Sequence, residues 1–191
     1  LKYLTKNTKL NLSKITNWLG TSVGSIISFF FCLGYSIDEI EEFILNFNFG
    51  ILEKSLIIDV DTFLTNYGLD DGTKIMYIII NFLKLKLNVN DITFIELYNI
   101  TKKNLSMIGT NYTKGTEVCF NHINYPTLSV IKAIRISISV PLLFTPVLYN
   151  NDYYVDGGII NNLPIKYCDP KTSLGIYLKF TCNNKFDNII S

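Results

Sequence analysis

The spacing of apolar and polar residues predicts alternating strands and helices from the N-terminus onward. Residues 14–19 mix β-branched, aromatic and polar side chains, as a short strand does. An almost unbroken apolar run over residues 26–33, followed by Gly34, predicts a buried helix with glycine at its C-terminal end. Ser36 and Glu39 then form a capping-box pattern. We expect the helix that it opens to pack behind the first.

The middle of the chain predicts two helices and a hairpin. Ile75–Leu87 is apolar with lysines only near its end, and two interpretations stay open: a core helix, or a helical flap that offers apolar surface to lipid. Thr93 and Glu96 form a second capping box for the next helix. Alternating patterns then predict a β-hairpin, or adjacent strands of one sheet, over residues 104–112 and 115–121.

The last third predicts one more helix and two more strands. Thr127–Val140 has a helical pattern that stops at Pro141, because a proline ring disfavours a helical residue before it. Asp152–Val155 predicts a short strand, and Leu174–Thr181 a further buried strand before a ragged C-terminal end. The whole pattern predicts an α/β chain whose length fits a single domain over residues 1–191.

Composition and charge restrict the class of protein. Hydrophobic residues make up 48% of the chain and aromatic residues 14%, which excludes a disordered protein. The formal net charge is only +1, with 17 basic and 16 acidic residues, and no basic run occurs. We therefore expect no nucleic-acid partner.

The cysteines and the apolar runs indicate the cellular compartment of the protein. The four cysteines form no C-x-x-C pair and predict buried thiols in a reducing compartment: Cys32, Cys119, Cys168 and Cys182. No secretory signal pattern is visible. Ile15–Ile37 is uncharged and long enough to cross a bilayer, but glycines and polar side chains interrupt it, so we expect no transmembrane span. These features favour a cytoplasmic protein, either free or peripheral at membranes.

One candidate for chemistry is the stretch Gly20-Thr21-Ser22-Val23-Gly24. It matches G-x-S-x-G, the sharp turn that lifts a nucleophilic serine from a strand into the start of a helix. Strand and helix crowd together at such a corner, so residues two positions from the serine must lack a Cβ atom, and Gly20 and Gly24 meet that need. Backbone N–H groups at the helix start can hold a developing oxyanion. The pattern indicates a serine nucleophile.

A second candidate lies where the strand over Asp152–Val155 ends. Asp156 is followed by Gly157 and Gly158, two residues that are free to turn sharply. The carboxylate therefore points off the end of a strand. In open α/β sheets, sites form at such strand ends.

Three segments together resemble the patatin-like phospholipase family. They follow one another in the family's order: the serine elbow at residues 20–25, a proline-spaced segment at 135–146 and the aspartate turn at 155–164. The hairpin stretch 109–120 resembles the family's usual lead-in, and the likeness covers residues 1–178. Three motifs in register make coincidence a poor explanation.

The resemblance implies a three-layer α/β/α fold with a mainly parallel central sheet, forming one catalytic domain. It also implies a Ser-Asp dyad that hydrolyses acyl esters of lipids without a metal or other cofactor. Ser22 would be the nucleophile, and Asp156 would accept its proton without an intervening histidine, giving an acyl-enzyme that water later releases. Gly157, Gly158 and Pro141 belong to the supporting motifs. The implied partner is a lipid or membrane-surface substrate, and the oligomeric state is left open.

The chain departs from the family pattern at its N-terminal end. Family members place a glycine-rich loop upstream of the segment that resembles residues 1–4, and N–H groups of that loop form most of the oxyanion hole. We therefore expect a partial domain, with the first strand and the loop missing and the Val23 N–H as the oxyanion donor that can be named. We expect it to be less stable and less active than a chain extended upstream.

Two other functions stay open. A Ser-His-Asp triad would use the single histidine, His122, as its base, but the order Ser22, His122, Asp156 differs from that of α/β-hydrolases. Alternatively, a lipid-binding or scaffold module would keep the fold and lack catalysis. The lipid head group, acyl position and chain length are not predicted.

The surroundings of the site also allow two interpretations. Pro141 and Pro146 either frame a loop along the site or frame a loop that faces the core. Leu142, Leu143 and Phe144 between them are apolar, and in the first case they would suit an acyl chain.

Overall fold

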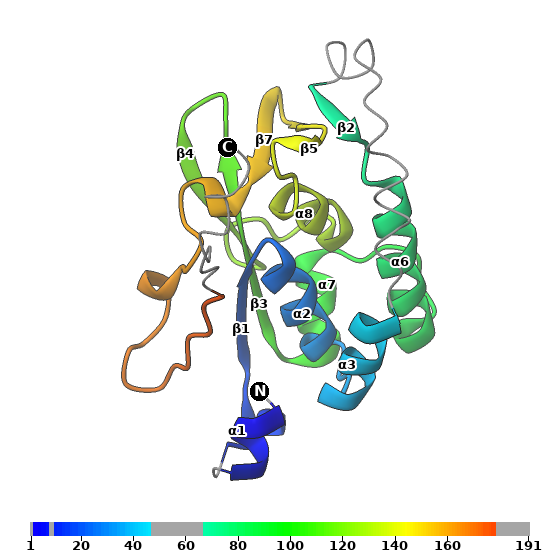
Figure 1. The fold of residues 1–191 in the computed structure, drawn as a ribbon, viewed down its shortest axis with the longest axis vertical. Coiled ribbons are helices and arrows are strands. Elements are labelled where there is room, and N and C mark those ends of the chain that lie inside the picture. Colours follow the sequence, from blue (N-terminus) through cyan, green and yellow to red (C-terminus); the bar gives the residue numbers. More distant parts are fainter. Residues whose placement is uncertain (1, 8–9, 47–66, 179–191) are drawn as a thin grey trace, which may run out of the picture.

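The computed structural model describes residues 2–7, 10–46 and 67–178 and has a mixed α/β fold (Figure 1). Its N-terminal part contains α1 (Lys2–Asn7), β1 (Asn17–Thr21), α2 (Val23–Cys32) and α3 (Ile37–Asn46). The remainder contains β2 (Gly68–Asp70), α6 (Thr73–Leu87), α7 (Phe94–Thr101), β3 (Asn104–Asn111), β4 (Thr116–Phe120), α8 (Val130–Ser137), β5 (Leu142–Phe144), β6 (Val147–Tyr149) and β7 (Asp152–Asp156). The predicted α/β class is confirmed.

The main sheet is built on β3. β4 runs antiparallel along one edge of β3, where it pairs with residues 107–111. β1 pairs in parallel with residues 104–108 of β3, and β7 pairs antiparallel with residues 109–111. Because β4 occupies the opposite edge at these positions, β1 and β7 follow one another along the same edge of β3. β6 adds to β7, while β2 and β5 form a separate parallel pair.

Two hairpins make this sheet less parallel than expected. Among the described strands of the main sheet, β1 and β3 pair in parallel, whereas β3–β4, β3–β7 and β6–β7 are antiparallel. β6 and β7 are joined through Asn150 and Asn151, whose φ angles of 49° and 63° are those of a tight hairpin turn. Strands joined by so short a turn can pair only antiparallel. This corrects the expectation of a mainly parallel sheet, while the predicted hairpin of β3 and β4 is confirmed.

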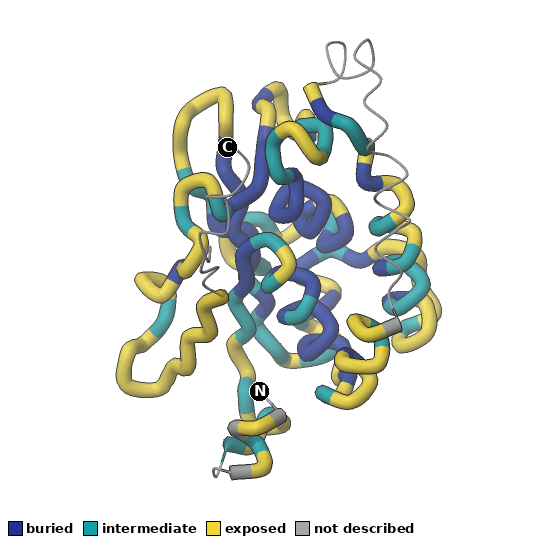
Figure 2. The backbone as a smooth tube through the Cα atoms, in the orientation of Figure 1, coloured by how far each residue is buried: buried dark blue, intermediate teal, exposed yellow. Residues whose placement is uncertain are grey.

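Helices cover one face of the main sheet. Figure 1 shows α2, α7 and α8 beside β1 and β3, with α3 and α6 farther out and the segment after β7 on the other side. Buried residues are concentrated in β3, α2 and α8 (Figure 2). The core therefore lies between the helices and the sheet. The C-terminal ends of β1 and β7 border this core on the face of the sheet that the helices cover.

An aromatic cluster fixes the outer helices to α2. The ring of Phe30 in α2 contacts Phe43 of α3 and Phe82 of α6, with ring centroids 5.5 and 4.8 Å away. On the same helix, α6 buries Ile79 and Leu83 in the core. Residues 75–87 therefore form a core helix, and the structure does not favour the interpretation of a lipid flap.

Capping side chains set the starts of two helices as predicted. At α3, the Ser36 N–H donates to the Glu39 carboxylate and the Glu39 N–H donates to Ser36 Oγ. At α7, Thr93 and Glu96 exchange the same pair of hydrogen bonds. Both capping boxes are therefore confirmed.

Other boundaries differ from the predictions. α8 is shorter than Thr127–Val140 because Ser129 Oγ accepts the N–H of Lys132 and caps the helix two residues into the predicted range. The strand predicted over Leu174–Thr181 is absent as far as residue 178: these residues pair with no described strand, and their apolar side chains are exposed. Residues 179–181 of that prediction, and Cys182, lie outside the described residues.

The apolar stretch Ile15–Ile37 is divided between β1 and α2. Within the described ranges, none of the helices has the length and hydropathy needed to cross a membrane.

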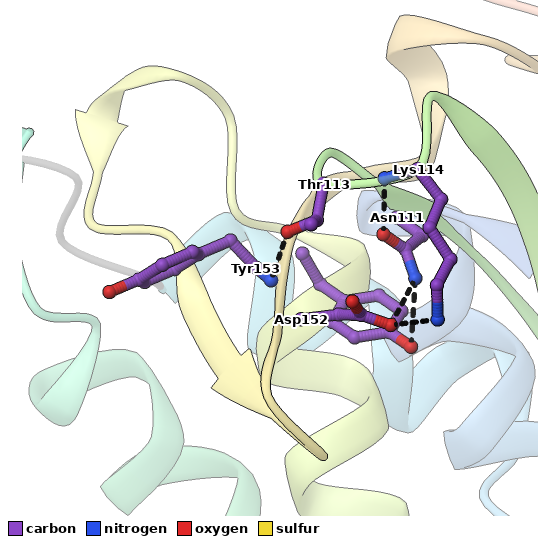
Figure 3. A network of polar contacts seen from close by, with 6 residues as sticks. Asn111, Thr113, Lys114, Asp152 and Tyr153 are labelled. Carbon is purple, nitrogen blue, oxygen red and sulfur yellow. Dashed lines mark hydrogen bonds and ion pairs between the residues drawn. The ribbon is translucent and has the colours of Figure 1, made fainter.

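A polar network joins the two hairpins at the N-terminal end of β7 (Figure 3). The Asp152 carboxylate accepts hydrogen bonds from Lys114 Nζ at 2.5 Å and from Asn111 Nδ2 at 2.9 Å. The Tyr153 N–H donates to Thr113 Oγ1 at 2.9 Å. These contacts hold β7 against the tip of the β3–β4 hairpin, so they also fix the direction in which β7 runs.

Candidate active site

The ends of β1 and β7 meet on one edge of β3. Thr21, the last residue of β1, lies opposite Ile108, and Asp156, the last residue of β7, lies opposite Gly109. Because β1 runs parallel to β3 and β7 runs antiparallel, their C-terminal ends face each other across one step of β3. Ser22 follows β1 directly, so the structure brings Ser22 and Asp156 together.

Ser22 has a strained backbone. Its φ of 55° and ψ of −130° lie outside the regions that L-residues ordinarily adopt, and α2 begins at the next residue. Strain of this kind costs roughly 1–3 kcal/mol and persists only where the surroundings impose it. A strained serine between a strand and a helix is the geometry of a nucleophile turn.

Only one of the two elbow glycines is required by the packing of the described residues. A Cβ atom on Gly20 would lie 2.2 Å from the carbonyl oxygen of Gly24 and 2.4 Å from the nitrogen of Ser25, so the strand and helix backbones touch here. A Cβ atom on Gly24 would meet nothing within 4 Å. The predicted crowding of strand and helix backbones is confirmed at Gly20. It is wrong for Gly24, because a side chain at Gly24 would enter open space.

The start of α2 presents backbone N–H groups to the site. The Ser22 N–H donates to Ser137 Oγ at 3.1 Å, and the Ser25 N–H donates to the Ser22 carbonyl at 2.8 Å. Since α2 begins at Val23, the N–H groups of Val23 and Gly24 have no acceptor within the helix. They also carry the partial positive charge of a helix N-terminus. Gly24 therefore joins Val23 as a candidate oxyanion donor.

The Asp156 carboxyl is buried, with its residue 4% exposed, and it is only partly satisfied. Oδ1 accepts the Gly158 N–H at 2.6 Å, whereas the buried Oδ2 has no hydrogen-bond partner among the described residues. Burial raises the pKa of Asp156 above its ordinary value, and hydrogen bonding by the Ser22 hydroxyl and the Gly158 N–H opposes this effect. The Ser22 hydroxyl is thus close enough to favour the ionised carboxylate, although no complete hydrogen bond reaches Oδ2.

The two glycines after Asp156 allow the chain to turn around the carboxylate. A Cβ atom on Gly157 would lie 2.3 Å from the carbonyl oxygen of Ile108 in β3. A Cβ atom on Gly158 would lie 2.9 Å from Asp156 Oδ1. Gly157 therefore permits the close approach to β3, and a side chain at Gly158 would displace the carboxylate itself.

Two residues that the sequence interpretation missed lie at the C-terminal end of α8. Ser137 accepts the Ser22 N–H, and the carbonyl of Ser139 accepts the Asp156 N–H at 2.9 Å. Both belong to the proline-spaced segment 135–146, and the sequence pattern predicts no role for either serine. A signal was present, because a serine between two isoleucines in an apolar helix must find buried hydrogen-bond partners.

Pro141 is half-buried and follows the last turn of α8. Between Pro141 and Pro146, the residues Leu142–Phe144 form β5, which pairs in parallel with β2. The segment is therefore a short strand, which corrects the expectation of a loop. Leu142 and Leu143 in it are exposed rather than packed into the core.

His122 does not join the site in the described structure. Its ring stacks on Tyr98 of α7, with centroids 4.1 Å apart, and its Nδ1 is buried without a partner among the described residues. The Ser22 N–H bonds to Ser137 and the Asp156 carboxylate bonds to the Gly158 N–H. The structure therefore does not assemble the alternative triad.

Two open hollows lie away from these residues. One of about 920 Å³ lies at the opposite end of α2 and is lined in part by Trp18, Phe31 and Lys103. The other, of about 500 Å³, lies beside β2. Across the described part of the chain, no three His, Cys, Asp or Glu side chains gather closely enough to hold a metal ion.

Fold and site together define an α/β protein with a strained serine turn beside a buried aspartate, and the comparisons with known proteins agree with that class. Residues 1–169 match the sequence model of the family described as patatin-like phospholipase. The chain therefore belongs to the patatin-like phospholipase family.

Relatives occur in viruses and bacteria. The chain is 32% identical over 169 residues to an uncharacterized protein of Acanthamoeba polyphaga mimivirus, covering 88% of this chain and 56% of that protein. It is 32% identical over 158 residues to a protein of Invertebrate iridescent virus 6 named probable lipid hydrolase 463L, covering 82% of this chain and 54% of that one. The chain thus spans about half the length of these relatives.

A solved structure shares the fold. The crystal structure of VipD from Legionella pneumophila superposes with a TM-score of 0.62 and 18% sequence identity, covering 89% of this chain and 45% of VipD.

Proposed function

We propose that this chain carries the catalytic centre of a lipid acyl hydrolase in which Ser22 is the nucleophile and Asp156 its base. The observation that carries the proposal is the state of the Asp156 carboxyl: Oδ2 is buried and has no hydrogen-bond partner among the described residues, and the Ser22 hydroxyl lies close enough to the carboxyl to lower its pKa. A buried acceptor without a partner is costly, so such groups persist mainly where function uses them. Asp156 Oδ2 is the acceptor to which the Ser22 proton would go.

The first half of the reaction follows from this pair. As Ser22 Oγ attacks the carbonyl carbon of an acyl ester, its proton passes to Asp156 Oδ2 and the carbonyl oxygen becomes an oxyanion. The tetrahedral intermediate then collapses, the bond to the alcohol oxygen breaks, and that oxygen takes the proton from Asp156. The products are a free alcohol and an acyl group bound to Ser22.

In the second half, water replaces the alcohol. Asp156 accepts a proton from the water molecule, whose oxygen attacks the acyl carbon. Collapse of the second tetrahedral intermediate returns the proton to Ser22 Oγ and releases a fatty acid. These steps need no metal, because one carboxylate moves every proton.

Backbone N–H groups would stabilise the oxyanion in both halves. The Val23 and Gly24 N–H groups at the start of α2 are the donors that the described residues offer. The family resemblance implies further donors from an upstream glycine-rich loop. Loss of a single donor typically slows a hydrolase ~10²–10³-fold, so these groups account for a large part of the rate.

A lipid substrate is supported by the apolar surface near the ends of β1 and β7. Val23 next to the nucleophile is 58% exposed, and Ile159 and Ile160 after the aspartate turn are exposed as well. Apolar side chains around a polar catalytic pair suit an acyl chain or a membrane surface. The name of the iridescent virus relative, probable lipid hydrolase, agrees with this substrate class.

The proposal can be tested with protein expressed from the complete reading frame that encodes this chain. Ester hydrolysis would be measured on chromogenic acyl esters and on phospholipid vesicles. We expect Ser22→Ala and Asp156→Asn to abolish turnover while leaving thermal unfolding cooperative. Asp152→Asn is the matched control, because it changes a carboxylate at the other end of the same strand. Equal activity of wild type and Asp156→Asn would contradict the proposal, and a folded wild type without activity on any ester would favour the non-catalytic lipid-binding module.

A further inference from the structure

The strained conformation of Ser22 needs a support that the elbow alone does not supply. Within the elbow, the Ser22 carbonyl accepts the Ser25 N–H, which is an ordinary contact at a helix start. The Ser22 N–H bonds outside the elbow, to Ser137 Oγ at the C-terminal end of α8, 115 residues away in sequence. Ser137 is therefore the distant side chain that holds the backbone of the proposed nucleophile.

The hydrogen bonds of Ser137 define its orientation. Its side chain is completely buried, and its hydroxyl donates to the Ile108 carbonyl of β3 at 2.6 Å. A hydroxyl has one proton, so Ser25 Oγ, 2.7 Å away, must donate to Ser137 Oγ. The Ser22 N–H takes the remaining acceptor position. With its single donor and both acceptor positions used, Ser137 Oγ cannot rotate without breaking a buried hydrogen bond.

The same segment also holds the proposed base. The carbonyl of Ser139, two residues after Ser137, accepts the Asp156 N–H at 2.9 Å. The N–H groups of Ser22 and Asp156 therefore end on neighbouring acceptors of one short segment, one on a side chain and one on the backbone. That segment fixes how far apart the two backbones lie.

Hydrogen bonds from Arg135 fix the position of the segment that contains Ser137 and Ser139. The Arg135 guanidinium is buried and donates to Ser139 Oγ at 2.5 Å, to the Thr145 carbonyl at 2.9 Å and to the Asp71 carbonyl at 2.8 Å. These bonds tie the end of α8 to β5 and to the turn before α6. The acceptors of Ser22 and Asp156 are thus part of a rigid support.

We propose that Ser137 is a positioning residue that holds the Ser22 elbow at the distance from Asp156 that proton transfer requires. The inference rests on the proposed function, because it assumes that Ser22 is the nucleophile. It goes beyond that function by assigning a role to a residue that touches neither substrate nor reacting atoms.

The test compares Ser137→Ala with Ser25→Ala in protein from the complete reading frame. Ser25→Ala is the matched control, because it removes the hydrogen bond between Ser25 and Ser137 but leaves the Ser22 N–H bonded. The readouts are kcat and KM on a chromogenic ester and the rate of Ser22 phosphonylation by a fluorophosphonate. Thermal unfolding shows that each variant is folded at the assay temperature.

We expect Ser137→Ala to lower kcat and the phosphonylation rate between about tenfold and a hundredfold at nearly unchanged KM, because a misplaced nucleophile loses attack geometry. Ser25→Ala should lose less than about threefold, and Ser137→Thr, which keeps the hydroxyl, should recover part of the rate. If Ser137→Ala does not fold, Ser137→Cys replaces it, since a thiol is only a weak acceptor.

Equal rate losses in Ser137→Ala and Ser25→Ala would overturn the positioning role and leave the proposed function standing. A Ser22→Ala variant that hydrolyses the ester like wild type would instead overturn the proposed function itself. The two failures are therefore distinguishable in one set of measurements.

Discussion

A Cβ atom on Gly20 would lie 2.2 Å from the carbonyl oxygen of Gly24, so the C-terminal end of β1 and the first turn of α2 are in backbone contact. The contact is one-sided, because the corresponding atom on Gly24 would meet open space. A fixed corner and an open position therefore lie on the two sides of Ser22. Gly20 is the crowded position and is needed for the fold. Gly24 is the open position and lies on the surface where a substrate would bind.

This asymmetry predicts different effects of the two glycine-to-alanine changes. Gly20→Ala should destabilise the protein by roughly 1–3 kcal/mol or more, because neither backbone can yield without moving the elbow. Gly24→Ala should change the free energy of unfolding by less than about 0.5 kcal/mol, as substitutions free of contacts do. Thermal and denaturant unfolding of both variants checks this. Equal stability of the two would contradict the one-sided contact.

The raised pKa of Asp156 predicts an acid limb in the pH profile of hydrolysis. Asp156 must be ionised to accept the Ser22 proton, so kcat/KM should fall as the pH drops through its pKa. Burial raises that pKa, which places the limb above the ordinary carboxyl value of about 4. Profiles of wild type and His122→Ala should coincide. An acid limb that disappears in His122→Ala would instead favour the histidine triad.

The Asp152 network predicts a pH-dependent contribution to stability. Hydrogen bonds from Lys114 and Asn111 lower the pKa of Asp152, and the same ion pair raises the pKa of Lys114. A carboxylate with a lowered pKa stabilises the fold above its unfolded pKa of about 4, and the contribution is lost as the pH falls through the folded pKa. The Lys114 contribution is present below about pH 10 and is lost above it.

The measurement is the free energy of unfolding of wild type and Asp152→Asn across the acid range. We expect wild type to be more stable at neutral pH and the difference to shrink as the pH falls below about 4. A constant difference from neutral to acid pH would show that the Asp152 charge does not stabilise the junction of the hairpins.

The exposed leucines of β5 predict a chain-length effect. Leu143 is 46% exposed, so replacing it by glutamine should cost little stability. If it contacts an acyl chain, Leu143→Gln should lower kcat/KM for long-chain esters roughly fivefold or more and leave short-chain esters almost unchanged. Leu148→Gln on β6 changes a similarly exposed leucine and serves as the control. Parallel losses on both ester lengths would place Leu143 outside the acyl path.

The sequence predicted features that depend on neighbouring residues. The turn around Ser22, the turn after Asp156 and both capping boxes each need only a few adjacent side chains, and each lies where it was expected. The direction of β7 was not predicted, because it depends on the Asn150–Asn151 turn and on the Asp152 contacts with another hairpin.

Contacts between residues far apart in the sequence were also not predicted, because they depend on how the whole chain folds. The bond from the Ser22 N–H to Ser137 spans 115 residues, and no local pattern records such a pairing. The predicted strand at Leu174 shows the opposite error, since alternating apolar residues form a strand only where a sheet edge receives them.

The central claim is that Ser22 becomes acylated with Asp156 as its base, and the most direct test is to locate the covalent intermediate. Protein from the complete reading frame would be mixed rapidly with a chromogenic ester, quenched in acid and digested, and the acylated peptide identified by mass spectrometry. We predict the acyl group on Ser22 in wild type and in Asp152→Asn, with acylation slowed ~10²–10⁴-fold in Asp156→Asn. An acyl group on another residue, or equal acylation rates in wild type and Asp156→Asn, would contradict the account.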